Sequence, residues 1–411
     1  MKKGYSTIGI IIASMIVMVV GFSFTAKDKL DIKTIEGDIN ELGDVSLVYT
    51  PAIKDLKKEE IVINKDGVKS ILKSDNTIGR DFVKSSSEHN DIIKNQFVER
   101  IYENEEYIGV FSFTNSYITP DNNNMEVIIK EKNKTTNEIK EYQIPVSLKN
   151  NENELSITEY YATKYKDSVY SISFDYSDGP MAICIFKTDI KNQTSEIIAR
   201  KEINENIQYG WYKFTVGNKI YIQLDEYSDY TKSYFLVFDM DKNTFSESNE
   251  FMNSKYEDGQ LLNKSVLDYN VTGNKLNILI KDNVMYKRNT SNVTKLVYNI
   301  DNDKVTLEDT VDYDLNIAYD YYISQAGADY DDSGVVGIKK VKMVDDKIYS
   351  IYQKTTTLSR KTDSGQRVIV KGNKPVEILV FDTTKNKTVY KGEITTGDVE
   401  IGRKLFLVKN Y

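Results

Sequence analysis

The sequence predicts an all-β protein that follows one N-terminal apolar helix. From residue 106 onward, β-branched and aromatic residues alternate with polar ones, and Asn, Asp and Gly interrupt them every few residues, which is typical of short antiparallel strands. A strand-turn-strand pattern recurs through this region. The chain has only 5 prolines and no long glycine or serine tract, so no interdomain linker is evident.

The N-terminal run Gly4–Ala26 contains no charged residue. As a helix it would extend roughly 34 Å, enough to cross a bilayer core of about 30 Å. It has no polar stripe, which argues against a helix packed on a soluble core. We therefore expect residues 1–26 to form a single-pass membrane anchor, with Lys2 and Lys3 cytoplasmic and the C-terminal domain extracytoplasmic. The alternative is a cleaved secretory signal, for which Phe24-Thr-Ala26 is a poor cleavage site.

The first ordered elements follow a polar segment. Residues 27–37 are expected to form a stalk. Asp38-Ile-Asn-Glu41 matches a capping box, and Gly43 can end the short helix that it predicts. Val45–Tyr49 and Glu60–Ile63 are predicted to be the first strands.

A turn and a second helix complete the N-terminal region. Lys65-Asp-Gly67 is typical of a hairpin turn. A helix is predicted over Asp91–Tyr102, because Ile93, Phe97 and Ile101 recur at four-residue spacing. Residues 38–105 would then form an α/β cap or the first repeat.

An internal repeat is the strongest pattern outside the apolar run. Tyr170 and Tyr221 are 51 residues apart, and so are the Tyr-Ser-Asp triplets that begin at Tyr176 and Tyr227. Each stretch continues into an apolar strand and a polar turn. Further copies occur at Gly273–Ile280, Lys295–Asn302, Asp345–Tyr352 and Glu377–Asn386, with a weaker copy in Glu106–Asn137.

Each copy is a small meander in which Asp or Asn caps a tight turn. With roughly 50–60 residues per copy, the pattern resembles a β-propeller, at the level of the fold and not of any one family. The resemblance implies one repeated domain over residues 106–411, and six or seven blades would fit. Two β-sandwich domains are the alternative, although they do not predict a constant offset.

Composition argues against several functions. The net charge is −8, whereas a nucleic-acid partner calls for a basic surface. One histidine and one cysteine leave no zinc site and no intramolecular disulfide. His89 lies in a polar segment without a nucleophile elbow nearby, and Cys184 lies in an apolar strand where a buried, inert thiol is expected. No cofactor is expected.

The Tyr-Ser-Asp loops are the candidate ligand site. Equivalent positions of a repeat lie on one rim, where tyrosines offer rigid contact area and carboxylates can receive a cation, a sugar or a peptide. The residues are Asp175, Tyr176, Asp178, Asp225, Tyr227, Asp229 and Tyr230. The alternative interpretation is that tyrosine fills blade edges and aspartate caps hairpins.

A calcium loop is a weaker hypothesis. Asp329, Asp331 and Ser333 occupy positions 1, 3 and 5 of an EF-hand-like pattern, with Gly334 at position 6. Position 12 is Lys340, where the pattern requires a bidentate glutamate. An acidic solvated loop is therefore the favoured interpretation.

The leading functional hypothesis is a non-enzymatic, membrane-tethered protein that binds an envelope protein or a cell-wall-associated ligand through loops on one rim. The first alternative is an exported carbohydrate-active hydrolase that uses paired carboxylates. The second is an accessory or sensor domain of an envelope signalling system.

Overall fold

The computed structural model describes seventeen stretches of the chain, and for part of them only the backbone. These are residues 31–51, 59–72, 92, 101–114, 117–118, 125–147, 155–175, 180–226, 232–253, 256–257, 260–261, 263–283, 292–301, 303–315, 330–361, 367–395 and 401–409. Within them nearly every element is a β-strand, so the all-β prediction is confirmed.

The long strands form six four-stranded antiparallel units, numbered here from the N-terminus. Unit 1 contains β2 (Val45–Pro51), β3 (Glu59–Asn64), β4 (Gly67–Leu72) and β29 (Ile401–Lys409). Unit 2 contains β5 (Ile101–Glu103), β6 (Tyr107–Phe113), β8 (Glu126–Asn133) and β9 (Ile139–Ser147). Unit 3 contains β10 (Leu155–Tyr165), β11 (Ser168–Asp175), β12 (Ala182–Asp189) and β13 (Thr194–Glu202).

The remaining units follow in chain order. Unit 4 contains β14 (Ile207–Val216), β15 (Lys219–Glu226), β16 (Lys232–Asp239) and β17 (Thr244–Glu247). Unit 5 contains β21 (Asn263–Thr272), β22 (Lys275–Asn283), β23 (Asn292–Asp301) and β24 (Lys304–Asp314). Unit 6 contains β25 (Tyr330–Val344), β26 (Lys347–Lys361), β27 (Arg367–Asp382) and β28 (Lys387–Thr395).

Five short elements accompany these units, besides β1. They are the 3₁₀ helix η1 (Ile39–Leu42) and the two-residue strands β7 (Tyr117–Ile118), β18 (Met252–Asn253), β19 (Tyr256–Glu257) and β20 (Gln260–Leu261). A short parallel pairing of β9 with β13 and the addition of β7 to β10 join units 2 and 3 into one nine-stranded sheet.

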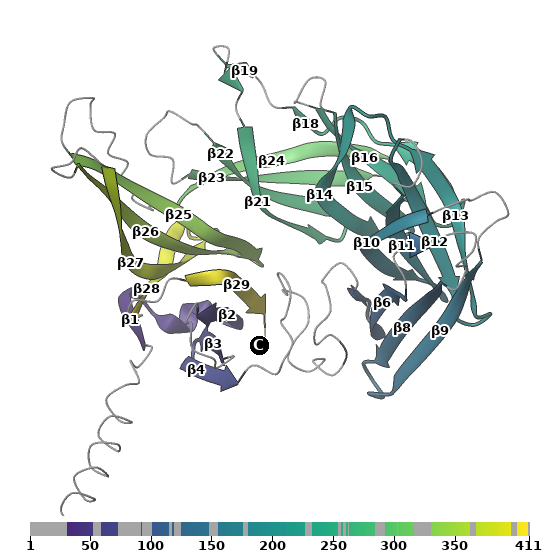
Figure 1. Ribbon diagram of the computed structural model, residues 1–411, viewed down its shortest axis with the longest axis horizontal. Helices are drawn as coiled ribbons and strands as arrows, with labels where there is room; N and C mark the ends of the chain where they lie inside the picture. Colours follow the sequence, from purple (N-terminus) through teal and green to yellow (C-terminus); the bar gives the residue numbers. More distant parts are fainter. Residues whose placement is uncertain are drawn as a thin grey trace, which may run out of the picture.

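The sheets follow one another around the molecule (Figure 1), and five pairs of units pack through buried apolar side chains: 2 with 3, 3 with 4, 4 with 5, 5 with 6 and 6 with 1. Such packing on both faces explains why the central strands are apolar almost throughout, as β11 and β12 are. One pair of buried residues illustrates each interface: Phe111 with Phe186 between units 2 and 3, Ile172 with Ile222 between 3 and 4, Phe235 with Ile278 between 4 and 5, Leu279 with Phe381 between 5 and 6, and Val380 with Leu47 between 6 and 1.

The strand register confirms the repeat. Ser168 and Lys219, which are 51 residues apart, each open the second strand of a unit and pair with Asp189 and Asp239, the last residues of the third strand. The same pairing recurs in units 2 and 6, and in unit 5 Lys275 pairs with Asn299, two residues before the end of β23. Tight turns after the first and third strands therefore lie together at one edge of each unit, which we name the turn edge.

The turn edge carries the same backbone bond in five units. In four units the residue that follows the third strand, and in unit 5 the next-to-last residue of that strand, donates its N–H to the carbonyl that precedes the second strand. The donor–acceptor pairs are Lys134 and Glu106, Ile190 and Asp167, Met240 and Asn218, Ile300 and Asn274, and Thr383 and Asp346. Residues with positive φ recur in these turns, among them Lys166, Gly217, Gly273 and Asp345.

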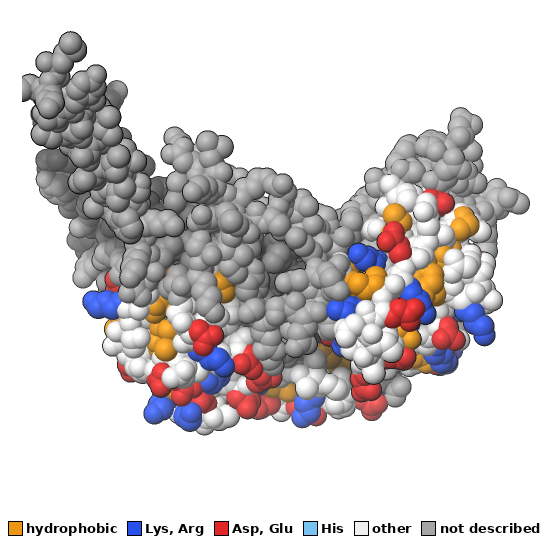
Figure 2. Space-filling view, turned by 90° about the horizontal axis from the view of Figure 1, so that it is seen from below, with side chains coloured by type: hydrophobic (Ala, Val, Ile, Leu, Met, Phe, Trp, Pro, Cys, Tyr) orange, Lys and Arg blue, Asp and Glu red, His pale blue; other side chains and the backbone are white. Residues whose placement is uncertain are grey.

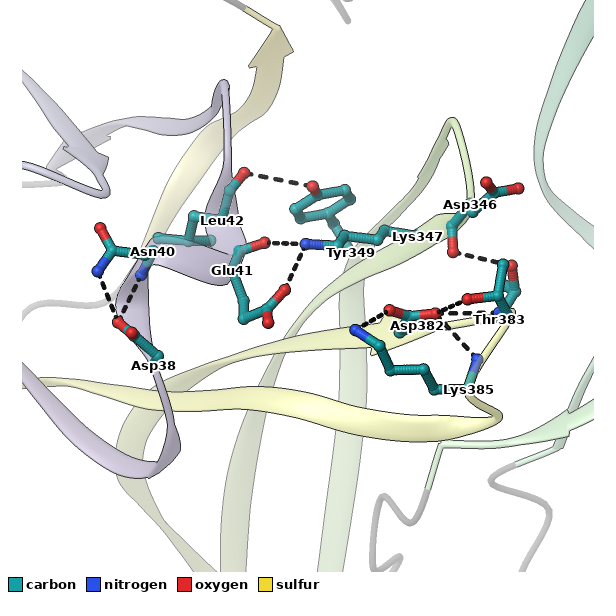
Figure 3. Close-up of polar contacts among 11 residues, drawn as sticks. Asp38, Asn40, Glu41, Leu42, Asp346, Lys347, Tyr349, Asp382, Thr383 and Lys385 are labelled. Atoms are coloured by element: carbon teal, nitrogen blue, oxygen red, sulfur yellow. Dashed lines mark hydrogen bonds and ion pairs between the residues drawn. The ribbon is translucent and has the colours of Figure 1, made fainter.

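The two ends of the chain exchange strands. β29, from the C-terminus, pairs with β2, while β1 (Asp31–Gly37) pairs with β28 at the outer edge of unit 6. Between them η1 packs on unit 6: Lys347 Nζ lies 2.6 Å from Glu41 Oε2, and the Tyr349 hydroxyl donates to the Leu42 carbonyl at 3.2 Å (Figure 3). The N-terminal residues are thus part of the fold that the C-terminal strands complete.

The short-helix prediction holds with one difference. Asp38 caps η1 by accepting from the Asn40 N–H at 2.9 Å, and Gly43 ends it with φ of 59°. The Glu41 side chain pairs with Lys347 and not with the backbone N–H of Asp38, so no reciprocal capping box forms.

Three other sequence predictions require correction. Residues 31–37 of the expected stalk form β1, because pairing with β28 orders a polar strand that has no apolar face of its own. The expected helix over Asp91–Tyr102 ends in strand β5, which starts at Ile101 and pairs with β6; of the rest only Ile92 is described. No helix among the described residues is long and apolar enough to cross a membrane, a finding that contradicts the predicted membrane localisation; Gly4–Ala26 lie outside those residues.

Candidate functional site

Two residues of the predicted ligand site are described, and both lie at the edge opposite the turn edge. Asp175 ends β11 in unit 3, and Asp225 lies one residue before the end of β15 in unit 4. Tyr176, Asp178, Tyr227, Asp229 and Tyr230 belong to the connections that follow these strands, outside the described residues. The repeat therefore brings the starting points of both connections to equivalent positions in neighbouring units.

The two aspartates have different surroundings. Asp175 is buried, and its Oδ2 lies 3.0 Å from Nη2 of Arg200, which comes from β13 in the same unit. This ion pair fixes the carboxylate beneath the edge. Asp175 therefore stabilises unit 3 through an ion pair between two of its strands, which is a structural role.

Asp225 is oriented by neutral donors. Its Oδ1 accepts from Ser233 Oγ at 2.6 Å and from Gln223 Nε2 at 2.8 Å. Its Oδ2 has no hydrogen bond within the described residues. The side chain is half-buried, and no opposite charge pairs with it in the described part of the chain. One carboxylate oxygen is thus held in place while the other can accept a hydrogen bond from a ligand.

Gln223 connects Asp225 to a backbone irregularity in β14. Tyr209 pairs with Leu224 and Lys213 pairs with Ile222, so the three residues between Tyr209 and Lys213 lie opposite Gln223 alone. Gln223 Oε1 accepts from the Tyr212 N–H at 3.2 Å. A Cβ on Gly210 would lie 2.2 Å from the Gln223 amide carbon, so only glycine leaves room for this side chain.

Bulges occur at the equivalent place in the first strand of three other units. The register shifts by one residue between Glu159 and Tyr161 in β10, between Val266 and Asp268 in β21, and between Ile338 and Lys340 in β25. The bulge in β14 is larger than these three and equal in size to the irregularity between β29 and β2 in unit 1. It contains Trp211, the only tryptophan of the chain. Bulges are common beside functional sites because they turn side chains away from the regular pleat.

Tyr212, at the end of the β14 bulge, is completely buried between units 4 and 5. Its ring contacts Tyr269 edge-on, with 4.6 Å between ring centroids. Its hydroxyl has no hydrogen-bond partner within the described residues. Burial raises the pKa of Tyr212 well above the usual range, and the nearby Tyr269 and Asp225 charges act in the same direction.

A buried ion pair lies on the other side of unit 5. Asp268, in the β21 bulge, accepts from Lys342 Nζ and from the Met343 N–H, each at 2.8 Å. Burial raises the pKa of Asp268, while the Lys342 charge opposes this shift. This contact joins units 5 and 6 and does not extend to Asp225 within the described residues.

The residues of the calcium hypothesis do not form a described loop. Asp331 and Ser333 belong to β25, where they pair with Ser359 and Thr357 in an extended ladder, and Asp329 lies outside the described residues. The tight turn that an EF-hand loop needs is not found over Asp331–Gly334. Within the described residues no group of three or more His, Cys, Asp or Glu side chains could hold a metal ion.

The two residues considered for nucleophilic or metal chemistry have separate outcomes. Cys184 is buried in β12, as predicted. His89 lies outside the described residues. The bulge of β14 and the orientation of Asp225 were not predicted; the run Gly210-Trp211-Tyr212 next to a strand was the available signal, since glycine inside a strand often marks a bulge.

No protein-family description matches the sequence, and no curated protein matches it. Several solved structures resemble the chain distantly. A protein from Lactobacillus plantarum shares 9% identity at a TM-score of 0.35, covering 89% of this chain and 98% of its own. An oligogalacturonate lyase in complex with manganese shares 10% identity at 0.31, covering 90% and 97%. An alpha-L-arabinanase from Penicillium chrysogenum, complexed with arabinobiose, shares 10% at 0.30, covering 56% and 64%. Likenesses this distant assign no activity to the chain.

Proposed function

We propose that this chain is a six-bladed β-propeller that binds a hydroxyl-rich ligand, such as a saccharide, beside Asp225. The observation that carries the proposal is the oriented carboxylate of Asp225, which lies next to the bulge in β14 where three residues face Gln223. The ligand class includes the cell-wall-associated polymers expected from the sequence.

The blade count is supported by how the units pack. Units 3, 4, 5 and 6 each contact a different neighbour on each face. Each sheet of a sandwich packs on one partner, whereas a propeller blade packs on two. Unit 1 takes β29 from the C-terminus, the kind of strand exchange that joins the last blade of a ring to the first.

The ligand class follows from the groups available. A carboxylate oxygen with unused lone pairs accepts hydrogen bonds from hydroxyl groups. Aromatic side chains offer rigid contact area to such a ligand, and the sequence places Trp211 in the bulge and Tyr227 and Tyr230 directly after β15. A ligand that presents hydroxyls at the edge of a flat apolar face fits this combination.

Hydrolysis of the same ligand is a second candidate. Glycoside hydrolases use one carboxylate as base or nucleophile and a second as acid, and a carboxylate fixed by hydrogen bonds is what the first role needs. Asp225 has this property. The geometry therefore does not favour a non-enzymatic binding protein over a hydrolase, because one oriented carboxylate serves binding and hydrolysis equally.

Asp225→Asn tests the proposal. Purified wild type is screened on a glycan array, and the strongest ligand is titrated by calorimetry. We expect Asp225→Asn to weaken binding at least about tenfold, because it removes a charge-assisted hydrogen bond worth roughly 1.5–3 kcal/mol. Asp241→Asn, at the turn edge, is the control and should leave the affinity unchanged. Release of reducing ends by wild type but not by Asp225→Asn would establish hydrolysis; wild type that binds no glycan would refute the proposal.

A further inference from the structure

Unit 2 has two different faces. One face packs on unit 3 through Phe111, Val127 and Ile129. The opposite face carries a small apolar cluster in which Ile92 packs on Ile108 and Val110 of β6. The described residues of unit 1 contribute nothing to this cluster, so this face of unit 2 differs from the sheet interfaces elsewhere in the fold.

A pocket of about 290 Å³ lies on this face. Among the described residues its lining comes from three adjacent strands and from Ile92: Ile92, Val110, Ser112, Ile128, Lys130 and Glu141. At about 30 Å³ per water, the volume corresponds to about ten non-hydrogen atoms. The volume therefore matches a metabolite of the size of one amino acid.

Two opposite charges line the pocket without pairing. Lys130 on β8 and Glu141 on β9 are direct cross-strand partners, and Val110 on β6 completes the row. Opposite charges in such positions commonly form an ion pair. Within the described residues neither side chain has an ion pair or a hydrogen bond, and the same is true of the Ser112 hydroxyl in the next row. The pocket thus presents one ammonium, one carboxylate and one hydroxyl over an apolar floor.

We propose that this pocket binds a free zwitterionic amino acid with an aliphatic side chain. The ligand carboxylate would bind to the Lys130 ammonium and accept from the Ser112 hydroxyl, while its own ammonium would bind to Glu141. The aliphatic side chain would pack on Ile92, Val110 and Ile128. A few placed polar groups over an apolar lining are the usual composition of a small-molecule site.

The charge pattern separates this ligand from related molecules. A fatty acid would leave Glu141 without a counter-charge, and an alkyl amine would leave Lys130 without one. A saccharide would match neither charge. The site is separate from Asp225 and independent of the function proposed above.

The test titrates the full chain with L-leucine by calorimetry, up to about 10 mM. 4-Methylpentanoate, which lacks the amine, and 3-methylbutylamine, which lacks the carboxylate, are titrated in parallel. We expect both analogues to bind at least about tenfold more weakly than leucine, since each loses one charge-assisted contact. This comparison uses the unaltered protein and does not depend on the folding of any variant.

Variants then locate the site. Lys130→Met and Glu141→Gln keep the size of each side chain and should each weaken leucine binding at least about tenfold. Lys140→Met and Glu138→Gln, which alter the exposed neighbouring pair, are the matched controls and should have no effect. Asp225→Asn should also leave leucine binding unchanged. Absence of leucine binding to wild type, equal binding of the analogues, or unchanged affinity in Glu141→Gln would overturn the proposal.

Discussion

The turn edge and the bulged first strands are both repeated features, but they differ in how faithfully they repeat. At the turn edge, five units make the same backbone bond between two turns. Along the first strands, units 3, 5 and 6 carry a one-residue bulge, whereas unit 4 carries a larger one, matched in size by the irregularity of β29 in unit 1. Uniform repetition is expected of contacts that only hold strands together, whereas variation between copies is expected where individual copies have acquired roles of their own.

The chemistry of the two regions differs in the same way. Turn-edge charges of both signs lie close together. Lys166 Nζ in unit 3 lies 2.6 Å from Asp241 Oδ1 in unit 4, and Lys219 Nζ in unit 4 lies 2.8 Å from Asp303 Oδ1 in unit 5. Figure 2 shows Lys, Arg, Asp and Glu side chains interspersed over the described surface. Near the bulges, by contrast, the ion pair of Lys342 and Asp268 is largely shielded from solvent, and Tyr212 lacks a described hydrogen-bond partner. Mutations in the two regions should therefore change the free energy of unfolding by different amounts and with different pH dependence.

The largest expected effect is at the buried pair of units 5 and 6. Lys342→Met should destabilise the protein by roughly 2–4 kcal/mol at pH 7, because it leaves the Asp268 carboxylate buried without its counter-charge. Urea unfolding measures the change. Lys275→Met, which removes a lysine from an exposed pair with Glu308, is the matched control and should cost less than about 1 kcal/mol.

The pH dependence of the same variant follows from the raised pKa of Asp268. A carboxyl group whose pKa is higher in the native than in the unfolded protein destabilises the native state as pH rises from the unfolded pKa through the native pKa. This cost vanishes once the group is protonated. Loss of Lys342 raises the native pKa further. The difference between wild type and Lys342→Met should therefore shrink as pH falls below about 5. A difference that stays constant down to pH 4 would contradict an ionised, buried Asp268.

At the turn edge, Asp382→Ala should cost about 1–2 kcal/mol. Asp382 Oδ1 accepts from the N–H groups of Thr384 and Lys385, each at 3.0 Å, and both donors lose this partner (Figure 3). Asp346→Ala is the control with less than about 0.5 kcal/mol, because the backbone carbonyl of Asp346 makes the turn contact and the substitution keeps it.

Acid should remove the Asp382 contribution. Hydrogen bonds from Thr384 and Lys385 hold the Asp382 pKa well below its usual range. A carboxyl group whose pKa is lower in the native than in the unfolded protein stabilises the native state at any pH above its unfolded pKa. This stabilisation declines as pH falls from the unfolded pKa through the native pKa. The cost of Asp382→Ala should accordingly be full at pH 7 and smaller below about pH 4. A free-energy cost of Asp382→Ala that grows in acid would exclude hydrogen bonds to the ionised carboxylate as its origin.

Most of the turn edge could be predicted from the sequence, because its contacts are local. Asp239, Asp382 and their equivalents cap turns within three residues, so the residue type and its recurrence after each apolar strand were sufficient. The pairing of β1 with β28 could not be found in the same way. It joins residues more than three hundred positions apart, and polar β1 shows no periodicity of its own.

The candidate site was predictable only in part. Asp225 was identified by its place in the repeat, but its orientation depends on Gln223, and that contact exists because β14 bulges opposite it. Bulges leave a weak signal in a sequence, since they change the register and not the composition. The pocket of unit 2 left no signal either, because Lys130 and Glu141 resemble any solvated pair until their strands are aligned.

The smallest expected effect compares two buried tyrosines. Tyr349→Phe should cost about 1 kcal/mol, because the Leu42 carbonyl loses the hydroxyl that donates to it at 3.2 Å. Tyr212→Phe should change the unfolding free energy by less than about 0.5 kcal/mol or slightly increase it, because its hydroxyl has no described partner to lose. Thermal and urea unfolding of both variants measure the contrast. Equal costs would mean that a bound water or ligand satisfies the Tyr212 hydroxyl in solution.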